Sequence, residues 1–348
     1  MEIQIGNMRL GEGAPVFVIA EAGVNHNGDS ALAKKLIDAA AAAGADAIKF
    51  QTFTPEELVS EAAPQAAYQT ANTGKEESQI SMLRDLVLPY GDHQALKSYA
   101  EGKGLVFLST PFSIPDADFL ETLGMAAYKI PSGELTNIPF LAHIARKGKP
   151  IILSTGMATL EEVREALDTL AGNGATEIAL FHCTTEYPTP PADINLRAMQ
   201  KLAQEFGLPT GLSDHSEGIS VPVAAVALGA QLIEKHFTLD RTLPGPDHKA
   251  SLEPDELKKM IGDIRIIERA LGSSEKKPVA GELETARVVR KSVVARRDIL
   301  IGTRITAEDI YIVRPGTGIP PKHFDEILGK TARETISQAT PLEWNMLS

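Results

Sequence analysis

Two apolar stretches of the chain each contain a histidine that follows another polar residue by two positions. They read PTGLSDHS and LIEKHFTLD. Side chains two apart on a strand share a face, so Ser213 lies beside His215 and Glu234 beside His236. Two neutral imidazoles with open coordination positions suit a borderline divalent ion such as manganese, cobalt or zinc. Such an ion would polarise a carbonyl group as a Lewis acid. We find no third histidine or cysteine in a matching position, which argues against a closed structural zinc site.

Lysines and hydroxyls occupy similar positions in other apolar runs. Lys49 and Lys129, with serine and threonine hydroxyls, suit a substrate that has both a phosphate and a carboxylate. A single serine or threonine is more often a helix cap or turn residue, so the argument depends on the whole set. That set is Glu21, Lys49, Gln51, Thr110, Lys129, Ser132, Glu134, Ser154, Thr185, Tyr187, Ser213, His215, Glu234 and His236. The residues alone indicate a metal-assisted enzyme that forms carbon–carbon bonds with an anionic substrate.

These residues sit in a strict alternation of apolar, β-rich runs with segments of helical periodicity. The predicted strands are 15–23, 46–53, 105–112, 126–134, 150–156, 177–187, 209–216 and 231–240. The predicted helices are 31–44, 93–104, 116–124, 137–148, 160–174, 196–207, 219–230 and 253–272. Eight such units predict an α/β fold, the (β/α)8 TIM barrel, in which reactive side chains lie at the carboxyl ends of the strands. An open doubly wound sheet is the alternative, but AEAGVNHNG matches its GxGxxG phosphate loop poorly.

The composition changes after the eighth helix. We predict a catalytic barrel over residues 1–271, a polar linker over 272–284 and a small module over 285–348. The module is near the lower size limit for an independent core, so we expect it to pack on a partner surface.

The overall composition excludes several functional classes. The formal net charge is 34 − 46 = −12 with no long basic run, so no nucleic acid or membrane partner is expected. Cys183 is the single cysteine, which fits a reducing compartment. The sequence shows no signal peptide and no 18-residue apolar run. A cytoplasmic protein is predicted.

Several motifs in order resemble the sialic acid (N-acetylneuraminate) synthase family. They are IAEAGVNHNG, KFQTF, STPF, YKIPSGE, ILSTGM, HCTTEYPTP, LSDHSEG, IEKHFTLDRTLPGPDHKASLEPDEL and RPGTGI. The tail from KSVVARRDI onward resembles the antifreeze-like (SAF) domain of these enzymes. The resemblance implies condensation of phosphoenolpyruvate with N-acetylmannosamine and water, giving N-acetylneuraminate and phosphate by cleavage of the C–O bond.

The resemblance also implies roles for individual residues. His215 and His236 would hold a divalent metal, Mn²⁺ first, with Mg²⁺ or Co²⁺ as alternatives. Phosphoenolpyruvate would contact Lys49, Thr110, Lys129, Ser132, Ser154 and Ser213, with Thr185 at a position where some members have asparagine. The amino sugar would contact Glu21, Gln51, Tyr187 and Asp247. Glu134, Glu234 and Glu21 are the candidates for handling charge and protons. Arg314 of the SAF domain would reach the acylamino group of the sugar across a domain-swapped homodimer.

The identity of the sugar is left open by these motifs. Legionaminic acid synthases, which use 2,4-diacetamido-2,4,6-trideoxymannose, share nearly all of them and are the alternative; pseudaminic acid synthases rank third. The deoxy, diacetamido sugar would need a roomier, apolar pocket around its C4 and C6. A metal-dependent aldolase or hydrolase on the same barrel, and a non-enzymatic binding protein, are further alternatives. The segment 54–92, with YQTANTGKEESQ, resembles a loop that covers the substrate.

Overall fold

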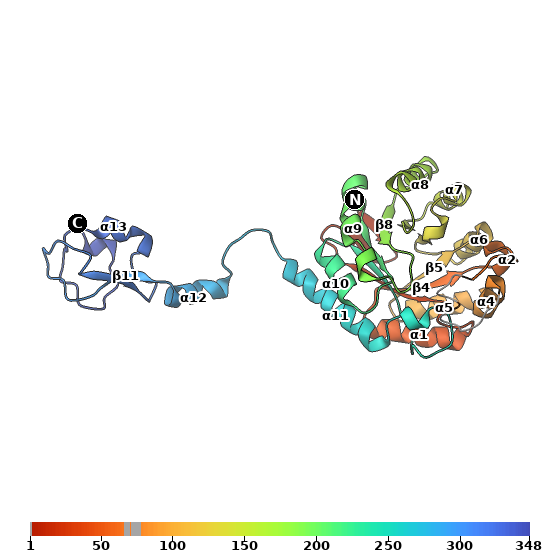
Figure 1. Cartoon of the computed structure of the whole chain (residues 1–348), viewed down its shortest axis with the longest axis horizontal. Helices are drawn as coiled ribbons and strands as arrows, with labels where there is room; N and C mark the ends of the chain where they lie inside the picture. The colour runs from red at the N-terminus through yellow and green to blue at the C-terminus, as the bar shows by residue number, and fades with distance from the viewer. Residues whose placement is uncertain (1, 66–69, 71–77) are drawn as a thin grey trace. The chain divides into compact units, whose positions relative to one another are not determined.

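The chain forms two compact units, Met1–Gly272 and Ser273–Ser348, which are described separately (Figure 1). The computed structural model describes residues 2–65, 70 and 78–348. Most of the stretch YQTANTGKEESQ, which we expected to cover the substrate, therefore lies outside the described residues.

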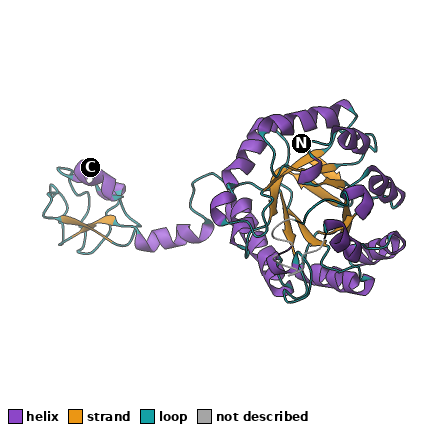
Figure 2. Ribbon diagram, turned by 45° about the vertical axis from the view of Figure 1, so that its right-hand side comes forward, coloured by secondary structure: helices purple, strands orange, loops and turns teal. Residues whose placement is uncertain are grey.

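The first unit contains an eight-stranded parallel sheet surrounded by helices (Figure 2). Its strands are β3 (Phe17–Gly23), β4 (Ala47–Thr52), β5 (Val106–Pro111), β6 (Tyr128–Ile130), β7 (Ile151–Ser154), β8 (Ile178–Cys183), β9 (Thr210–Asp214) and β10 (Leu232–His236). The last strand pairs with the first, with Leu232 opposite Phe17 and His236 opposite Glu21. The hydrogen-bonded order ends at β5 and β6, which lie against each other. The predicted (β/α)8 fold class is confirmed.

Each barrel strand is followed by a helix of the outer ring. These helices are α1 (Ser30–Ala43), α5 (Tyr90–Gly102), α6 (Ile114–Thr122), α7 (Ile138–Ala145), α8 (Leu160–Gly172), α9 (Leu196–Phe206), α10 (Ser220–Ala227) and α11 (Pro254–Leu271). Local sequence sets their ends. Asp29 caps the start of α1, and Gly44 ends it with a left-handed φ of 83°, a conformation that favours glycine. Between β4 and α5, the described residues include the helices α2 (Pro55–Leu58) and α4 (Gln79–Leu86), which were not predicted.

The inner face of the barrel changes from apolar to polar along the strands. On β3 the inward side chains are Phe17 and Ile19, followed by Glu21. The lower layers contain Ala47, Val106, Leu108, Ala127, Ile152, Ala179, Phe181 and Leu232. A hairpin of β1 (Glu2–Ile5) and β2 (Met8–Gly11) adds Ile3, Ile5 and Leu10 to the same cluster. The hairpin therefore closes the amino end of the barrel, and the polar side chains gather at the other end.

The outer face of two strands holds a buried ion pair. Lys235 of β10 donates to Asp214 of β9, with Nζ 2.6 Å from Oδ2, and also to the carbonyl oxygen of Ser216. Asp214 accepts a further bond from the Ser216 backbone amide at 3.1 Å. Both charges are buried and compensated, as a stable buried pair requires. The pair joins β9 to β10 directly behind the two strand ends that contain histidine.

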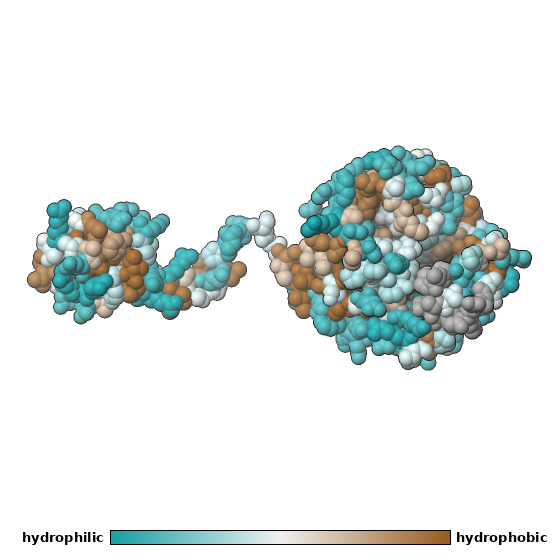
Figure 3. Space-filling model, viewed as in Figure 1, coloured by the Kyte–Doolittle hydropathy of each residue, from teal (hydrophilic) through white to brown (hydrophobic). Residues whose placement is uncertain are grey.

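The second unit begins with α12 (Ala280–Val289) and has a small core of its own. Its strands β11 (Ser292–Ala295) and β12 (Ile310–Val313) pair antiparallel. Isoleucines, including Ile299, Ile310 and Ile336, dominate the core. Apolar side chains are exposed near the end of α11 and along α12, among them Ile266 and Leu283 (Figure 3). Among the described residues, no helix is long and apolar enough to span a membrane.

Candidate active site

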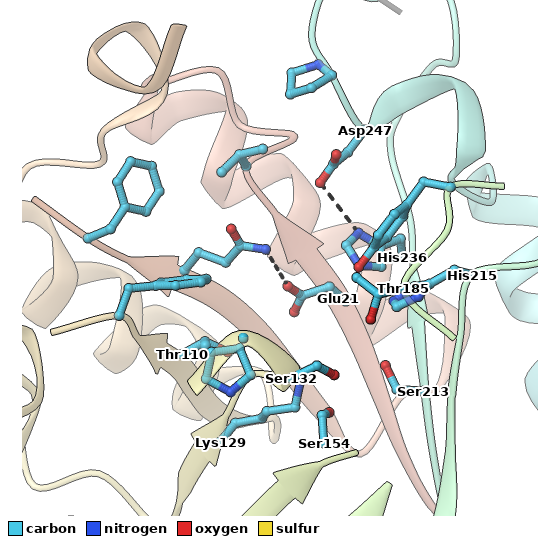
Figure 4. Close-up of a pocket in the computed structure, with 18 of the residues that line it drawn as sticks. Glu21, Thr110, Lys129, Ser132, Ser154, Thr185, Ser213, His215, His236 and Asp247 are labelled. Atoms are coloured by element: carbon cyan, nitrogen blue, oxygen red, sulfur yellow. Dashed lines mark hydrogen bonds and ion pairs between the residues drawn. The ribbon is translucent and has the colours of Figure 1, made fainter. Parts of the chain in front are cut away.

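The polar strand ends converge on one cavity of about 500 Å³ at the carboxyl end of the barrel (Figure 4). Every predicted site residue of the first unit except Glu134 lines it. Those residues are Glu21, Lys49, Gln51, Thr110, Lys129, Ser132, Ser154, Thr185, Tyr187, Ser213, His215, Glu234, His236 and Asp247. The strand residues are buried except for Gln51, which is half-buried, whereas Ser132, Thr185, Tyr187 and Asp247 are more exposed and lie on the segments that follow the strands.

Four buried charges occupy the floor of this cavity. Lys49 Nζ lies 2.7 Å from Glu21 Oε2 and 3.6 Å from Glu234 Oε2. Lys129 Nζ lies 3.2 Å from Glu234 Oε1 on the other side. Two ammonium groups thus alternate with two carboxylates, and each charge has an opposite neighbour. Such pairing is what allows charges to remain ionised in a protein interior.

The two glutamates differ in their affinity for a proton. Burial alone would raise the pKa of Glu234, but Lys129 and Lys49 outweigh burial and lower the pKa to about 2. Ser213 supports the carboxylate by donating a hydrogen bond of 2.9 Å. Burial raises the pKa of Glu21 to about 7; Lys49 opposes this shift, and the Glu234 carboxylate adds to it. Glu234 is therefore fixed as an anion, whereas Glu21 can gain or lose a proton near neutral pH.

Hydroxyl groups lie beside Lys129. The Ser132 hydroxyl accepts a 3.0 Å bond from the Gly156 amide. The Ser154 hydroxyl oxygen is buried and has no hydrogen-bond partner among the described residues. A Cβ added at Gly156 would lie 2.3 Å from Thr185 Oγ1 and 2.7 Å from Ser132 Oγ, so only glycine leaves room for both hydroxyls. A buried donor without a partner, next to an ammonium group, is suited to an anionic ligand.

The two strand-end histidines, His215 and His236, face each other on the side of the cavity opposite Lys129 (Figure 4). Their ring centroids are 5.3 Å apart, and the Tyr187 ring lies 4.0 Å from that of His215. His215 Nδ1 lies 2.8 Å from the carbonyl oxygen of Thr184, so Nδ1 donates, and Nε2 has a lone pair when the ring is neutral. Burial, with His215 and Lys49 nearby, lowers the pKa of His236 well below its usual value.

This donor set fits a divalent metal ion. His236 is held neutral, its buried Nδ1 has no hydrogen-bond partner among the described residues, and the Thr184 carbonyl orients His215 from behind. Asp247 Oδ2 lies 3.7 Å from His236 Nδ1 and adds a carboxylate nearby. No cluster of three or more His, Cys, Asp or Glu ligands is preformed within the described ranges. Water or substrate oxygens would therefore complete the coordination, as in an open catalytic site.

One predicted site residue of the barrel, Glu134, does not line the cavity. Glu134 ends the short helix η1 (Ser132–Glu134) and accepts a 2.6 Å bond from Asn137, which caps α7. The bond places the Glu134 carboxylate at the start of α7. Arg314 belongs to the second unit, where it is exposed just after β12.

Sequence reasoning missed the apolar side chains that line the cavity. They are Val24, Phe53, Leu58, Val59, Met82, Leu83, Leu86 and Phe112, and we call them the apolar wall. Five of the eight come from the segment that contains α2 and α4. Met82, Leu83 and Leu86 recur at helical spacing in ISMLRDL, which was the available signal.

Substitution of His236 by alanine should abolish Mn²⁺ binding by the chain without substrate. The variant keeps only one of the two imidazole ligands, and water in the open coordination positions cannot replace the lost nitrogen donor. Calorimetric titration with MnCl₂ measures the effect. His143→Ala, on the outer helix α7, is the matched control and should bind Mn²⁺ as the unaltered chain does. Equal Mn²⁺ affinity in the His236→Ala variant would reject the two-histidine site.

Comparison with known proteins shows which family the chain belongs to. The NeuB family model matches residues 36–276, and the SAF domain model matches residues 290–348. The N,N'-diacetyllegionaminic acid synthase of Legionella pneumophila is 48% identical over 96% of this chain and 95% of its own length. The enzyme of the same name from Campylobacter jejuni is 49% identical over 92% of this chain and 97% of its own length.

A solved structure agrees with these relatives. The N-acetylneuraminic acid synthetase of Leptospira borgpetersenii, crystallised with citrate, is 37% identical and superposes with a TM-score of 0.72. The match covers 82% of this chain and 95% of that chain. The resemblance inferred from the motifs is thereby confirmed. The chain belongs to the NeuB family of nonulosonic acid synthases, transferase-type enzymes that use phosphoenolpyruvate, and it ends in a SAF domain.

Proposed function

We propose that the chain condenses phosphoenolpyruvate with 2,4-diacetamido-2,4,6-trideoxymannose to give N,N'-diacetyllegionaminic acid and phosphate. The first expectation from the sequence, N-acetylneuraminate from N-acetylmannosamine, is replaced by its alternative. Two relatives that are nearly half identical over almost the whole chain are N,N'-diacetyllegionaminic acid synthases.

The apolar wall is the observation in this cavity that supports the choice of sugar. The wall groups aliphatic and aromatic side chains along one part of the lining, and Phe53 and Phe112 are in edge-to-face contact with ring centroids 6.2 Å apart. The proposed sugar has a methyl group at C6 and an acetamido methyl at C4, and both are apolar. Burying them against the wall would remove apolar surface from water at about 25 cal/mol per Å².

N-Acetylmannosamine would fit the same wall poorly. It has hydroxyl groups at C4 and C6, where the proposed substrate has an acetamido group and a methyl group. Each hydroxyl that loses water against apolar side chains without a new partner costs about 1–3 kcal/mol. Two such losses would favour the deoxy sugar, and an apolar pocket typically rejects an added hydroxyl by about 10²-fold.

The chain's own residues would bind and orient phosphoenolpyruvate. Lys129 and the hydroxyls of Ser132 and Ser154 would hold its anionic groups, together with Lys49, Thr110, Thr185 and Ser213. Held in this way, its C3 would face the sugar aldehyde. A C–C bond then forms from C3 to the aldehyde carbon, and the aldehyde oxygen takes a proton to become a hydroxyl group. Water adds at C2 and loses a proton, and the C–O bond to phosphate breaks as the new C2 hydroxyl gives up its proton and becomes the ketone.

Glu234 and Glu21 would have different tasks in that sequence. Glu234, with a pKa of about 2, stays anionic and stabilises the positive charge that develops at C2. Glu21, with a pKa of about 7, can accept the proton of the attacking water or of a sugar hydroxyl. A divalent ion bound by His215 and His236, manganese in our proposal, would polarise the sugar aldehyde.

Offering the two sugars side by side tests the proposal. We expect phosphate release with the 2,4-diacetamido sugar to have a kcat/KM at least tenfold higher than with N-acetylmannosamine, because of the apolar wall. Malachite green detection of phosphate measures both reactions under identical concentrations of phosphoenolpyruvate and Mn²⁺. Equal or reversed preference would overturn the assigned sugar, and sugar turnover without phosphoenolpyruvate would indicate an aldolase instead.

A variant of the wall sharpens the same comparison. Leu58→Asn supplies a hydrogen-bonding side chain to the cavity and should shift the preference about tenfold toward N-acetylmannosamine, equivalent to about 1.4 kcal/mol. Leu271→Asn, at the exposed end of α11 and outside the cavity, is the control and should leave the preference unchanged.

Gly156→Ala should raise the KM for phosphoenolpyruvate about tenfold or more and affect the KM for the sugar less. The new methyl group would displace the Ser132 and Thr185 hydroxyls from the proposed anion subsite. Steady-state kinetics with each substrate varied in turn measures the two constants. Gly172→Ala, where a Cβ meets nothing within 4 Å, is the control. A selective effect on the sugar would place the anion subsite elsewhere.

Arg314 would act on the sugar in a domain-swapped homodimer. Its exposed guanidinium on the SAF domain could donate to the acylamino carbonyl of a sugar bound to the partner's barrel. Arg314→Ala should raise the KM for the sugar more than that for phosphoenolpyruvate. Mixing Arg314→Ala with the inactive His236→Ala variant should restore activity in heterodimers. Failure of the mixture to recover activity would contradict a site shared between two chains.

A further inference from the structure

Asp247 lies on a loop whose two ends are tied together. The loop runs from the end of β10 to the start of α11, and Thr238 N donates to Leu252 O at 2.8 Å. Leu252 N donates in turn to His236 O at 2.9 Å. These bonds fix the base of the loop next to His236. They do not by themselves fix its tip, where Asp247 Oδ2 faces His236 Nδ1 at 3.7 Å.

Asn25, in the turn VNHNG after β3, connects to Asp247 through one serine. The Asn25 side-chain amide is 1% exposed and donates to Phe237 O and to Ser251 Oγ, both at 2.9 Å. Ser251 Oγ then donates to the backbone carbonyl of Asp247 at 2.7 Å. Two consecutive hydrogen bonds therefore link the turn after the first barrel strand to the backbone of Asp247.

Asn27 holds the tip of the same loop. Its amide donates to Pro244 O at 2.9 Å, and its oxygen lies 3.3 Å from His248 Nε2. His248 Nδ1 lies 2.7 Å from Thr238 Oγ1. Burial lowers the pKa of His248 to about 4, so the ring is neutral. The ring therefore bridges Thr238 at the base of the loop and Asn27 in the turn, and the Thr238 hydroxyl also lies 3.2 Å from the carbonyl oxygen of Asp240.

The same turn also contacts the apolar wall. Val24 packs with Met82, Leu83 and Leu86 of α4. A Cβ at Gly28 would lie only 3.0 Å from the carbonyl oxygen of Asp85, so the turn and the end of α4 are in close contact. One turn of five residues thus supports both the Asp247 loop and one part of the apolar wall.

We propose that Asn25 and Asn27 are positioning residues that hold Asp247 over His236, so that Asp247 meets the hydroxyls of the amino sugar. Neither asparagine lines the cavity, so each acts through the loop that it binds. The inference depends on the proposed function for the contact between Asp247 and the sugar. In this proposal, the VNHNG turn positions another loop and does not bind phosphate.

A double-mutant cycle tests the path from Asn25 to Asp247. Asn25→Ala and Asp247→Ala should each raise the KM for the amino sugar about tenfold, with the KM for phosphoenolpyruvate changed less than twofold. In the Asp247→Ala background, adding Asn25→Ala should change the sugar KM by less than twofold, because coupled residues are not additive. Full additivity, a further tenfold rise, would overturn the proposal.

Asn173→Ala is the matched control for the kinetics. Asn173 also makes two side-chain hydrogen bonds, to Arg146 and to the Thr169 carbonyl, but it lies at the end of α8 in the outer ring. Its loss should leave both KM values unchanged. If Asn173→Ala and Asn25→Ala raise the sugar KM equally, a general loss of stability explains both, and the proposal fails.

Amide hydrogen exchange gives a readout that needs no substrate. Asn25→Ala should increase exchange at the Thr238, Ser251 and Leu252 amides at least tenfold, because the loop loses its anchor. Exchange within α8 should be unchanged. Unaltered loop exchange would overturn the positioning role whichever sugar the enzyme uses. Turnover of neither sugar by the unaltered chain would instead overturn the proposed function and leave this exchange result standing.

Discussion

Mutual neutralisation of four buried charges is the constraint on which the catalytic end of the barrel depends. Glu21, Lys49, Lys129 and Glu234 come from four different strands, and each has a group of opposite charge within 3.6 Å. The balance of charges also determines which carboxylate takes up a proton when an anion enters the cavity. Glu234 is held by two ammonium groups, so added negative charge would protonate Glu21, whose pKa is already about 7, first.

Along each strand, the inner face of the barrel has apolar packing residues first and polar cavity residues at the carboxyl end. On β3, Phe17 and Ile19 precede Glu21; on β10, Leu232 precedes Glu234 and His236. This order was readable from the sequence, because a strand places alternate residues on one face and a barrel puts all strand ends together. The fold class and the strand-end members of the cavity were therefore predictable from local pattern alone.

Features that depend on contacts between distant segments were not predictable in this way. The apolar wall requires α2 and α4 to fold over the cavity, and their sequence gives no indication of which surface they cover. Asn25 and Phe237 are 212 positions apart, and their hydrogen bond is not encoded by either local motif. Glu134 follows a strand end as the residues that line the cavity do, but the chain turns there into η1 and directs its side chain to Asn137. A position just after a strand predicts only that the residue lies at the carboxyl end of the barrel. The turn that follows determines where its side chain points.

The hairpin of β1 and β2 has a consequence for the order of events during turnover. It seals the amino end with Ile3, Ile5 and Leu10, so traffic into the barrel passes through the carboxyl end. A molecule bound against the buried Lys129 and Ser154 must then enter before any molecule seated nearer to Tyr187 and Asp247. Because the amino end is closed, the two ligands bind in a fixed order, and the inner ligand cannot leave while the outer ligand is bound.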